Sequence, residues 1–275
     1  MTAAPTLTIV IVSYNARSDL ERCLRGLTEH AAHTPHQIVV VDNASSDGTP
    51  TMVRSLFPGV AVIEHTENLG FAVATNHGIR STSSDLVLLL NGDTVVPAGA
   101  IDHLVNVLRA NPGVTIVGPR LVDQEGVAEL STGAMIGPLT ELGQKIVGVL
   151  HRRGFPPVRR YVERLSRLER RPDWVSGACL MMRRAEAERA GLLDERYFLY
   201  NEDVDLCAAV RRAGGGVVFT PQVTVVHRRG RSAATAPSAS AAAYRRSQIA
   251  FYRKHHPRWV PVLEAFLRLT GRHPS

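Results

Sequence analysis

Cysteine is scarce in this chain of 275 residues, and its three cysteines argue against both a disulfide framework and a zinc site. Cys23, Cys179 and Cys207 are odd in number, lie far apart and form no CxxC pair, which fits a reducing compartment. No uninterrupted apolar run approaches the roughly 18 residues that a membrane span needs. The first residues also lack the basic start and the small-residue cleavage site of a signal peptide. These absences predict a cytoplasmic protein.

Two common phosphate-binding signatures are also missing. Neither the GxGxxG fingerprint of dinucleotide-binding folds nor the GxxxxGK[ST] loop of P-loop NTPases occurs in the sequence. A dehydrogenase and a P-loop NTPase are therefore disfavoured. A nucleotidyltransferase that makes nucleotide sugars is disfavoured for a similar reason, because the N-terminal part has no glycine-rich, lysine-bearing phosphate loop.

Positive charge is concentrated in the second half of the chain. Residues 1–150 carry 8 basic and 14 acidic side chains, whereas residues 151–275 carry 24 basic and 11 acidic ones. The stretch 145–171 alone has nine basic and two acidic residues. Such a half attracts a phosphorylated substrate, an anionic membrane surface or nucleic acid, and it equally fits a solvated arginine-rich surface. Charge alone does not decide between these interpretations.

Apolar runs alternate with helical patterns over the first 120 residues. We predict strands at 7–14, 37–43, 60–64, 86–90 and 114–117, with amphipathic helices between them. This order predicts an α/β domain with a Rossmann-like, mainly parallel sheet that is covered by helices. In such sheets ligands bind beyond the carboxyl ends of the strands, so the polar residues that follow each run are candidates for the site.

The pattern is looser after residue 122. Residues 123–173 contain glycines, prolines and the basic stretch, without a clear element. Further strands are predicted at 174–182, 217–219 and 223–226, and a helix at 204–212. Residues 232–243 are rich in Ser, Ala, Thr and Pro, which predicts a flexible loop. A helical tail is expected to follow this loop.

Asp93 and His227 are candidate metal ligands. Asp93 follows the wholly apolar run 86–90, so its carboxylate projects from the ligand-binding edge of the sheet. A lone carboxylate at such a place is more often a turn or helix cap, but as a hard oxygen ligand it would hold Mg²⁺ or Mn²⁺ against phosphate oxygens. His227 ends the run 223–226. Alone it indicates a strand terminus, whereas beside Asp93 it would complete a site that favours Mn²⁺.

Three carboxylates stand at the start of the predicted helix 204–212, in the order Glu202, Asp203 and Asp205. Acids favour the first turn of a helix because of the helix dipole. Three of them after an aromatic-rich segment exceed what capping requires, and like charges this close raise one pKa toward the range of a general base. The cluster therefore predicts a base that takes a proton from a substrate hydroxyl.

Seven segments together resemble glycosyltransferase family 2, and more narrowly its bacterial rhamnosyltransferase-like branch. In chain order they are IVIVSYN, VVVDNASSDGT, ENLGFAVATNHGI, LLLNGDTVV, WVSGACLMMRR, FLYNEDVDLCAAVRRAG and VVHRRGRS, which span residues 9 to about 232. Any one segment is a weak signal, and seven in family order are a strong one. The resemblance implies a GT-A fold, a nucleotide-sugar donor and an inverting transfer to an acceptor hydroxyl.

The same resemblance implies a role for each matching residue. Asp203 would be the catalytic base, with Glu202 and Asp205 in support, and Asp93 and His227 would bind Mg²⁺ or Mn²⁺. The donor would be bound by Ser13, Tyr14, Asn15, Asp42, Asn43, Asn68, Gly70, Asn76, Asn91, Gly92 and Asp93. The acceptor would be bound by Trp174, Ser176 and Gly177.

Two positions depart from the family pattern. Asn91 stands where the family's DxD motif has its first Asp, which removes one negative charge from the metal site. Asn43 replaces an acid that is common in other branches. This replacement fits a thymidine nucleotide, and dTDP-rhamnose is the expected donor.

The family also implies a division of the chain. One GT-A domain would cover residues 1–230, with a nucleotide-sugar donor half at 1–122 and an acceptor half at 123–230. Residues 231–275 would form the flexible loop and a basic helical tail. The loops between 123 and 173 would determine the sugar and the acceptor.

Basic residues lie beside apolar and aromatic ones in the stretch 145–171, and again in the tail at Trp259 and Phe266. This composition is typical of a segment on an anionic membrane surface. We therefore expect a cell-envelope glycan or a polyprenyl-diphosphate-linked saccharide as the acceptor, and a peripheral location on the inner face of the cell membrane. A soluble small molecule or secondary metabolite is the alternative acceptor.

A basic nucleic-acid-binding or scaffold protein is the alternative that involves no catalysis. We disfavour it, because the acids at 202–205 would repel nucleic-acid phosphates unless a metal ion intervened. It would also leave Asp93 at the end of its strand without a role.

Overall fold

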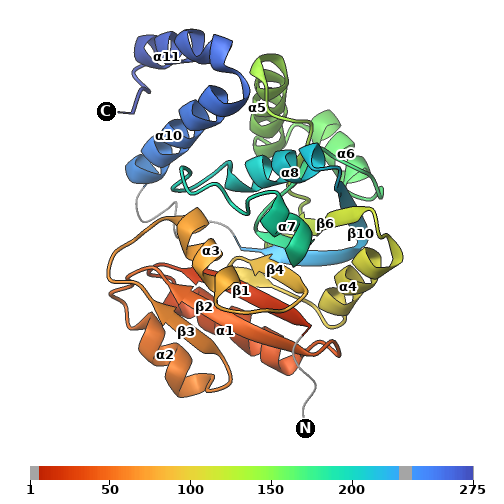
Figure 1. Cartoon of the computed structure of the whole chain (residues 1–275). Coiled ribbons are helices and arrows are strands. Elements are labelled where there is room, and N and C mark those ends of the chain that lie inside the picture. Colours follow the sequence, from red (N-terminus) through yellow and green to blue (C-terminus); the bar gives the residue numbers. More distant parts are fainter. Residues whose placement is uncertain (1–5, 229–236, 275) are drawn as a thin grey trace.

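Eight strands form one sheet in the computed structural model of the chain, which describes residues 6–228 and 237–274 (Figure 1). They are β1 (Leu7–Ser13), β2 (His36–Asp42), β3 (Ala61–Glu64), β4 (Leu86–Leu90), β5 (Thr94–Val95), β6 (Val114–Val122), β9 (Cys179–Arg183) and β10 (Gly216–His227). Their order across the sheet is β3-β2-β1-β4-β9-β6-β10-β5. Strands β3, β2, β1 and β4 are parallel, as are β6 and β10, whereas β9 and β5 run antiparallel to their neighbours. The predicted mainly parallel sheet is confirmed.

Helices cover both faces of this sheet. On one face lie α1 (Arg17–Glu29), α2 (Thr49–Leu56) and α4 (Ala100–Ala110), and on the other lie α3 (Phe71–Arg80), α7 (Arg184–Arg189) and α8 (Glu202–Arg212). The side chains of β1 alternate between the two layers: Ile9 and Ile11 pack with the first set of helices, and Val10 packs with the second. Burial on two faces explains why strands such as β4 are apolar at every position.

The second half of the sheet differs from the predicted strands. The run 174–182 is broken at residues 176–178, which separate β9 from β8 (Trp174–Val175); β8 pairs with β7 (Thr132–Gly133) in a separate small sheet. The runs at 217–219 and 223–226 belong to one strand, β10, whose pairing with β6 shifts register between Thr220 and Thr224. Pro221 lies inside this irregularity, where a residue without a backbone N–H is tolerated.

Residues 123–173 contain two helices that the sequence pattern did not reveal, α5 (Pro138–Arg152) and α6 (Pro156–Leu165). In α5 the usual burial is reversed, because its buried residues are Glu141, Gly148 and His151. Four apolar side chains of α5 are exposed instead: Leu139, Leu142, Ile146 and Val149. Leu139 is 83% exposed. A pattern that assigns apolar residues to the core therefore fails on this helix.

The C-terminal tail packs against the domain. It consists of α10 (Pro237–His255), a 3₁₀ turn (Pro257–Trp259) and α11 (Val260–Leu269). The predicted loop at 232–243 is wrong from Pro237 onward, because four of the seven residues 237–243 are alanine, the strongest helix former; residues 229–236 lie outside the described ranges. Helix α10 docks on α5 through Glu141, whose carboxylate accepts hydrogen bonds from Gln248 and Tyr252, each at 2.6 Å.

Helices α5, α10 and α11 lie together at the end of the molecule opposite the N-terminus (Figure 1). Four apolar residues are exposed at and along α11, namely Trp259, Val262, Phe266 and Leu269, and Leu269 is 90% exposed. No helix in the described part of the chain is both long enough and apolar enough to cross a membrane.

Candidate active site

The carboxyl ends of β1 and β2 form a buried polar corner. Ser13 and Asp42 are paired in register at these ends, and both are almost fully buried. Asp42 Oδ2 accepts a hydrogen bond from the Ser45 N–H at 2.8 Å. Ser13 Oγ and Asp42 Oδ1 have no hydrogen-bond partner among the described residues. Two buried polar atoms without a partner at this edge of the sheet indicate that a polar ligand completes the corner.

The loops that follow β1 and β2 are bonded to each other beside this corner. Asn15 has a left-handed φ of 48°, and its Oδ1 accepts the Ser46 N–H at 2.8 Å. In return, the Asn15 N–H donates to Ser45 Oγ at 2.9 Å. Tyr14, next to it, is exposed. The structure therefore brings together Ser13, Tyr14, Asn15 and Asp42, the residues expected to line a nucleotide pocket.

Asn43 has a structural role. Its Nδ2 donates to Asn68 Oδ1 at 2.8 Å and to the Gly70 carbonyl at 3.1 Å, and its Oδ1 accepts the Leu69 N–H at 3.0 Å. These bonds tie the end of β2 to the loop before α3. Because Asn43 is buried and its amide is used by this loop, it shapes the donor side by holding Asn68 and Gly70 in place.

Gly70 and Asn76 connect the donor side to the loop 193–201, which leads into α8. Gly70 has a φ of 85°, and a Cβ there would lie 2.5 Å from the Phe198 carbonyl oxygen, so a larger residue is excluded. The buried side chain of Asn76 bonds to Leu193 with both amide atoms. Its Nδ2 donates to the Leu193 carbonyl at 2.8 Å, and its Oδ1 accepts the Leu193 N–H at 3.2 Å. Both residues therefore hold the loop 193–201, which precedes Asp203, against the expected donor half.

Asp93, Asn91 and His227 meet where β4, β5 and β10 come together. His227 Nε2 lies 3.3 Å from Asp93 Oδ1 and 3.4 Å from Asn91 Nδ2. The antiparallel pairing of β10 with β5 sets Thr94 opposite His227 and thereby brings the two segments into contact. Gly92 separates Asn91 from Asp93 in the turn between β4 and β5.

Glu129 completes this corner, and sequence reasoning missed it. Its Oε2 lies 3.2 Å from His227 Nδ1. Burial by itself would lower the pKa of His227, but the hydrogen bonds and charges of Asp93 and Glu129 outweigh burial and raise that pKa to about 9. A carboxylate on the second ring nitrogen is the usual device that orients a metal-ligating histidine. No pattern marked Glu129, because 98 residues separate it from His227.

The corner fits a divalent cation that shares its coordination with a ligand. A carboxylate and an imidazole are ligand types that Mn²⁺ accepts, and Mg²⁺ is commonly held by one or two carboxylates. Over the described ranges, no group of three or more His, Cys, Asp or Glu side chains is arranged to hold a metal ion by itself. The remaining positions would be filled by water and diphosphate oxygens, as is usual for Mg²⁺ at phosphate sites.

Asp203 is held at the start of α8 by two backbone N–H groups. Its Oδ2 accepts the Gly177 N–H and its Oδ1 accepts the Val204 N–H, each at 2.8 Å. A Cβ at Gly177 would lie 3.2 Å from Asp203 Cβ, so a glycine permits this close approach. Burial raises the pKa of Asp203, and the two hydrogen bonds oppose the rise. A carboxylate that is fixed in this way, with a pKa above its ordinary value, suits a general base.

Glu202 has a different environment. It is buried, and its Oε2 has no hydrogen-bond partner within the described part of the chain. Burial and the neighbouring charge of Asp203 raise the pKa of Glu202 well above its ordinary value. Both carboxyls thus have a raised pKa, but only the charged form of Asp203 is stabilised by two backbone N–H groups, which makes Asp203 the better candidate base.

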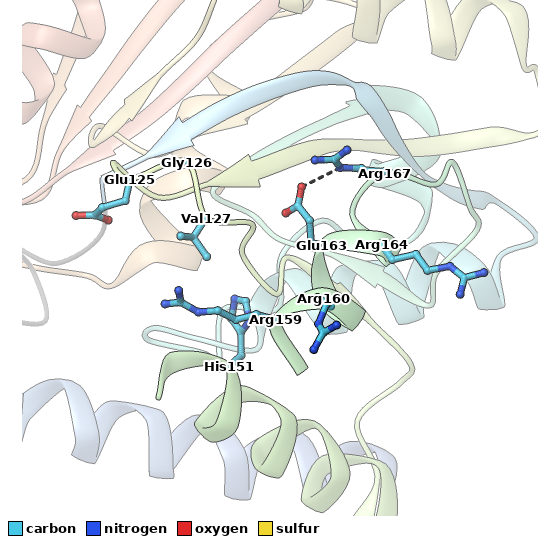
Figure 2. Close-up of a pocket in the computed structure, with 9 residues that line it drawn as sticks. All are labelled: Glu125, Gly126, Val127, His151, Arg159, Arg160, Glu163, Arg164 and Arg167. Atoms are coloured by element: carbon cyan, nitrogen blue, oxygen red, sulfur yellow. Dashed lines mark hydrogen bonds and ion pairs between the residues drawn. The ribbon is translucent and has the colours of Figure 1, made fainter. Parts of the chain in front are cut away.

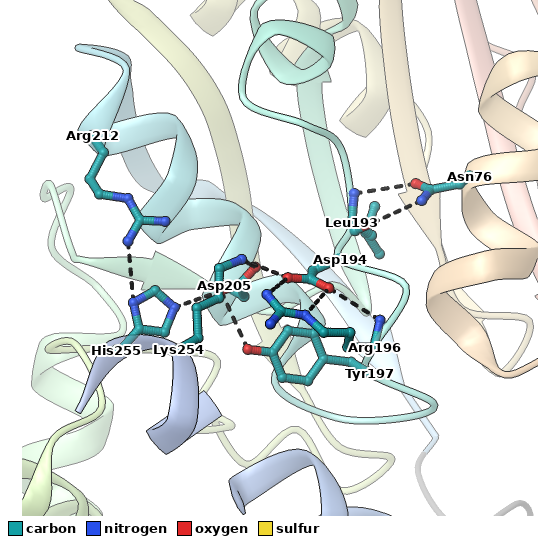
Figure 3. Close-up of polar contacts among 9 residues, drawn as sticks. All are labelled: Asn76, Leu193, Asp194, Arg196, Tyr197, Asp205, Arg212, Lys254 and His255. Atoms are coloured by element: carbon teal, nitrogen blue, oxygen red, sulfur yellow. Dashed lines mark hydrogen bonds and ion pairs between the residues drawn. The ribbon is translucent and has the colours of Figure 1, made fainter. Parts of the chain in front are cut away.

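Asp205 binds α10 and does not contact Asp203 through its carboxylate (Figure 3). It is 1% exposed; its Oδ2 lies 2.7 Å from Lys254 Nζ, and its Oδ1 lies 2.6 Å from His255 Nε2. Lys254 Nζ also lies 2.7 Å from Asp194 Oδ2, in the loop before α8. The expectation that Asp205 supports the base directly is therefore corrected, because residues two apart on a helix do not face each other. Its carboxylate joins α8, the preceding loop and α10.

Trp174 and Ser176 fix the turn that carries Gly177. Trp174 Nε1 donates to the Ala134 carbonyl at 2.9 Å, and the Ser176 N–H donates to the Ser131 carbonyl at 2.8 Å. Trp174, Ser176 and Gly177, which are expected on the acceptor side, thus lie in one segment. The N–H of Gly177 in this segment donates to Asp203.

The family model for glycosyl transferase family 2 matches residues 8–188. Over 264 residues the chain is 31% identical to the N-acetylglucosaminyl-diphospho-decaprenol L-rhamnosyltransferase of Mycobacterium tuberculosis, with 92% of this chain and 86% of the relative covered. The chain belongs to glycosyltransferase family 2. It is also 27% identical to the pre-mycofactocin glycosyltransferase of M. tuberculosis, a match that covers 80% of this chain and 42% of that relative. The protein is thus a glycosyltransferase.

Two solved glycosyltransferase structures share its fold. A mannosyltransferase from Pyrobaculum calidifontis, in complex with GDP-Man and Mn²⁺, matches with a TM-score of 0.63 at 22% identity and covers 96% of this chain and 69% of that one. GalNAc-T7, with UDP, GalNAc and Mn²⁺, matches with a TM-score of 0.63 at 17% identity and covers 89% and 48%. The predicted GT-A fold is confirmed.

We predict that Asp203→Asn lowers kcat by about 10²–10⁴-fold, the usual contribution of a general base. The donor Kd should stay within about threefold, because the lost interaction is made in the transition state. Steady-state kinetics and equilibrium binding of the nucleotide sugar measure the two quantities. Glu202→Gln is the matched control and should lower kcat less. Equal losses in the two variants would contradict the assignment of the base to Asp203.

Proposed function

We propose that this glycosyltransferase transfers L-rhamnose from dTDP-rhamnose to a hydroxyl of a polyprenyl-diphosphate-linked saccharide, with inversion at the anomeric carbon. The reversed burial of α5 carries the acceptor assignment, because an exposed apolar face suits an enzyme whose acceptor is anchored in a membrane. The mycobacterial relative, an N-acetylglucosaminyl-diphospho-decaprenol L-rhamnosyltransferase, supports the same sugar and the same class of acceptor. Cell-envelope glycan synthesis is the corresponding process.

The chemistry is a single displacement. The acceptor oxygen attacks the anomeric carbon while Asp203 takes its proton, and the bond from that carbon to the diphosphate oxygen breaks on the opposite face. Asp93 and His227 would hold Mg²⁺ or Mn²⁺, whose charge stabilises the departing diphosphate. Ser13 Oγ and Asp42 Oδ1 would bind the nucleoside, which supplies the partners that these buried atoms lack.

Support for the thymidine nucleotide comes from the rhamnosyltransferase resemblance alone. The argument from Asn43 is weakened, because its amide bonds to Asn68, Leu69 and Gly70 and faces their loop. Rhamnose itself is supported by the relative that is 31% identical.

Donor and metal are tested together. We expect dTDP-β-L-rhamnose to be used with a kcat/KM at least about tenfold above that of UDP-sugars, and the product to have the opposite anomeric configuration.

Excess EDTA, or Asp93→Ala, should lower transfer by at least about 100-fold, because the leaving diphosphate loses its counter-charge. Full activity in EDTA would overturn the metal site. A product that retains the donor's configuration would rule out the single displacement.

Two apolar stripes form the proposed membrane surface. One consists of Leu139, Leu142, Ile146 and Val149 on α5, and the other of Trp259, Val262, Phe266 and Leu269 at α11. Both stripes have the spacing of one helix face, and both helices lie at the same end of the molecule (Figure 1). The stretch 145–171 adds nine basic residues, so the occupant that complements this surface is an anionic membrane. The protein would then work in the cytoplasm, bound to the inner face of the cell membrane.

We expect the protein to sediment with anionic vesicles at low salt and to be released at high salt. Each basic residue near such a surface contributes about 1 kcal/mol, and salt screens that attraction. Ile146→Glu should abolish sedimentation, whereas Leu56→Glu, an equally exposed apolar residue on α2, should not. Failure of the wild type to bind would favour a soluble acceptor. If the wild type forms dimers in solution and Ile146→Glu makes the protein monomeric, the stripe on α5 binds a second copy of the chain and not a membrane.

A further inference from the structure

We propose that a groove beside α6 binds the diphosphate of the acceptor lipid; this assignment rests on the proposed function. The groove has a volume of about 600 Å³ and is open to solvent. The turn 125–127, the end of α5 and helix α6 form its walls (Figure 2). It contains none of the residues that the family resemblance assigns to donor, acceptor or metal.

Positive charge in this groove lacks partners. Four arginines line it, Arg159, Arg160, Arg164 and Arg167. The carboxylate of Glu163 is occupied by Arg120 and Arg167, each at 2.9 Å. Among the described residues, none of Arg159, Arg160 and Arg164 forms an ion pair, and the nearby Glu163 is already paired with Arg120 and Arg167. Several arginines in one groove, three of them without a carboxylate partner, are suited to bind a polyvalent phosphate through charge-assisted hydrogen bonds.

His151 provides an independent sign of a ligand. It is buried in the wall of the groove, and its Nε2 donates to the Ala128 carbonyl at 2.8 Å. Its Nδ1 is buried and has no hydrogen-bond partner among the described residues. A buried polar atom without a partner in the wall of a groove indicates that a polar ligand or a water bound with it completes the site. Arg159 lines the same groove (Figure 2).

The groove lies close to the reaction centre along the chain. Val127 lines the groove, and Glu129, two residues later, contacts His227 at the metal corner. The Cα atoms of Val127 and Glu129 are therefore at most about 7 Å apart. The segment continues to Ser131, whose carbonyl fixes the turn that presents Gly177 to the base. A sugar attached to a diphosphate in the groove would extend along this segment toward Asp203.

The surroundings of the groove distinguish a lipid diphosphate from a free one. Phe155 and Tyr161, which are exposed, stand close to Arg159 and Arg160 in the chain, and the Phe155 carbonyl accepts the Arg159 N–H at 3.0 Å. An amphiphile would place its diphosphate among the arginines and its prenyl chain along these two aromatic side chains. Free pyrophosphate would contact the arginines but would make no contact with the aromatic side chains.

The test compares two acceptors that carry the same sugar, one linked through diphosphate to a short prenyl chain and one linked directly to an octyl chain. We expect the double variant Arg159→Ala, Arg160→Ala to raise KM for the first acceptor by about 10–100-fold, because two charge-assisted contacts are lost. KM for the second acceptor, and KM for the donor, should change less than about threefold. Arg189→Ala, which removes an exposed arginine from α7, is the matched control and should behave as the wild type.

Direct binding separates failure of the groove from failure of the proposed function. In the presence of saturating dTDP, which blocks the donor site, wild type should bind farnesyl diphosphate about tenfold more tightly than the double variant and more tightly than inorganic pyrophosphate. An unchanged affinity in the variant would overturn the groove even if transfer to lipid acceptors occurs. If the wild type binds inorganic pyrophosphate as tightly as farnesyl diphosphate, the proposed preference of the groove for a lipid diphosphate is wrong. Absence of transfer with intact farnesyl diphosphate binding would count against the proposed function alone.

Discussion

A buried ion pair between Asp205 and Lys254 is the constraint on which the geometry of the site depends. Asp205 follows Asp203, the proposed general base, by two residues, and Lys254 comes from α10, 49 residues further on. Through Asp194 the same lysine holds the loop before α8, and Asn76 holds that loop from the donor side. A carboxylate as buried as Asp205 is strongly destabilising without its partner. Helix α10, which carries Lys254, is therefore a structural part of the glycosyltransferase domain.

The donor and acceptor sides are built in different ways. Strand ends fix the donor side, because the register of β1 and β2 places Ser13 beside Asp42. The acceptor side consists of loops and helices that distant contacts hold together, such as Glu141 on α5 with Tyr252 on α10. This division fits the proposed function, in which one side presents buried polar atoms to a nucleotide and the other exposes an apolar and basic surface to a lipid-linked acceptor.

The periodicity of apolar residues correctly predicted the elements whose apolar side chains face the core. It failed for elements whose apolar side chains face solvent. The strands before residue 120 and the meeting of Asp93 with His227 follow from apolar runs and from the rule that ligands gather at strand ends. Helix α5 could not be predicted in this way, because it buries Glu141 and exposes Leu139. The roles of Asp205 and Glu129 depend on partners 49 and 98 residues away, which no local pattern encodes.

The most direct test of this account is the effect of Lys254→Met on catalysis and on donor binding. If the ion pair between Lys254 and Asp205 positions Asp203, Lys254→Met should lower kcat at least about tenfold while the donor Kd stays within about threefold. Lys254→Arg, which keeps the positive charge, should retain part of the wild-type kcat. Lys145→Met, which removes the other lysine of the chain, is the control. A Lys254→Met protein that unfolds more readily but keeps the wild-type kcat would show that the ion pair stabilises the fold without setting the position of Asp203.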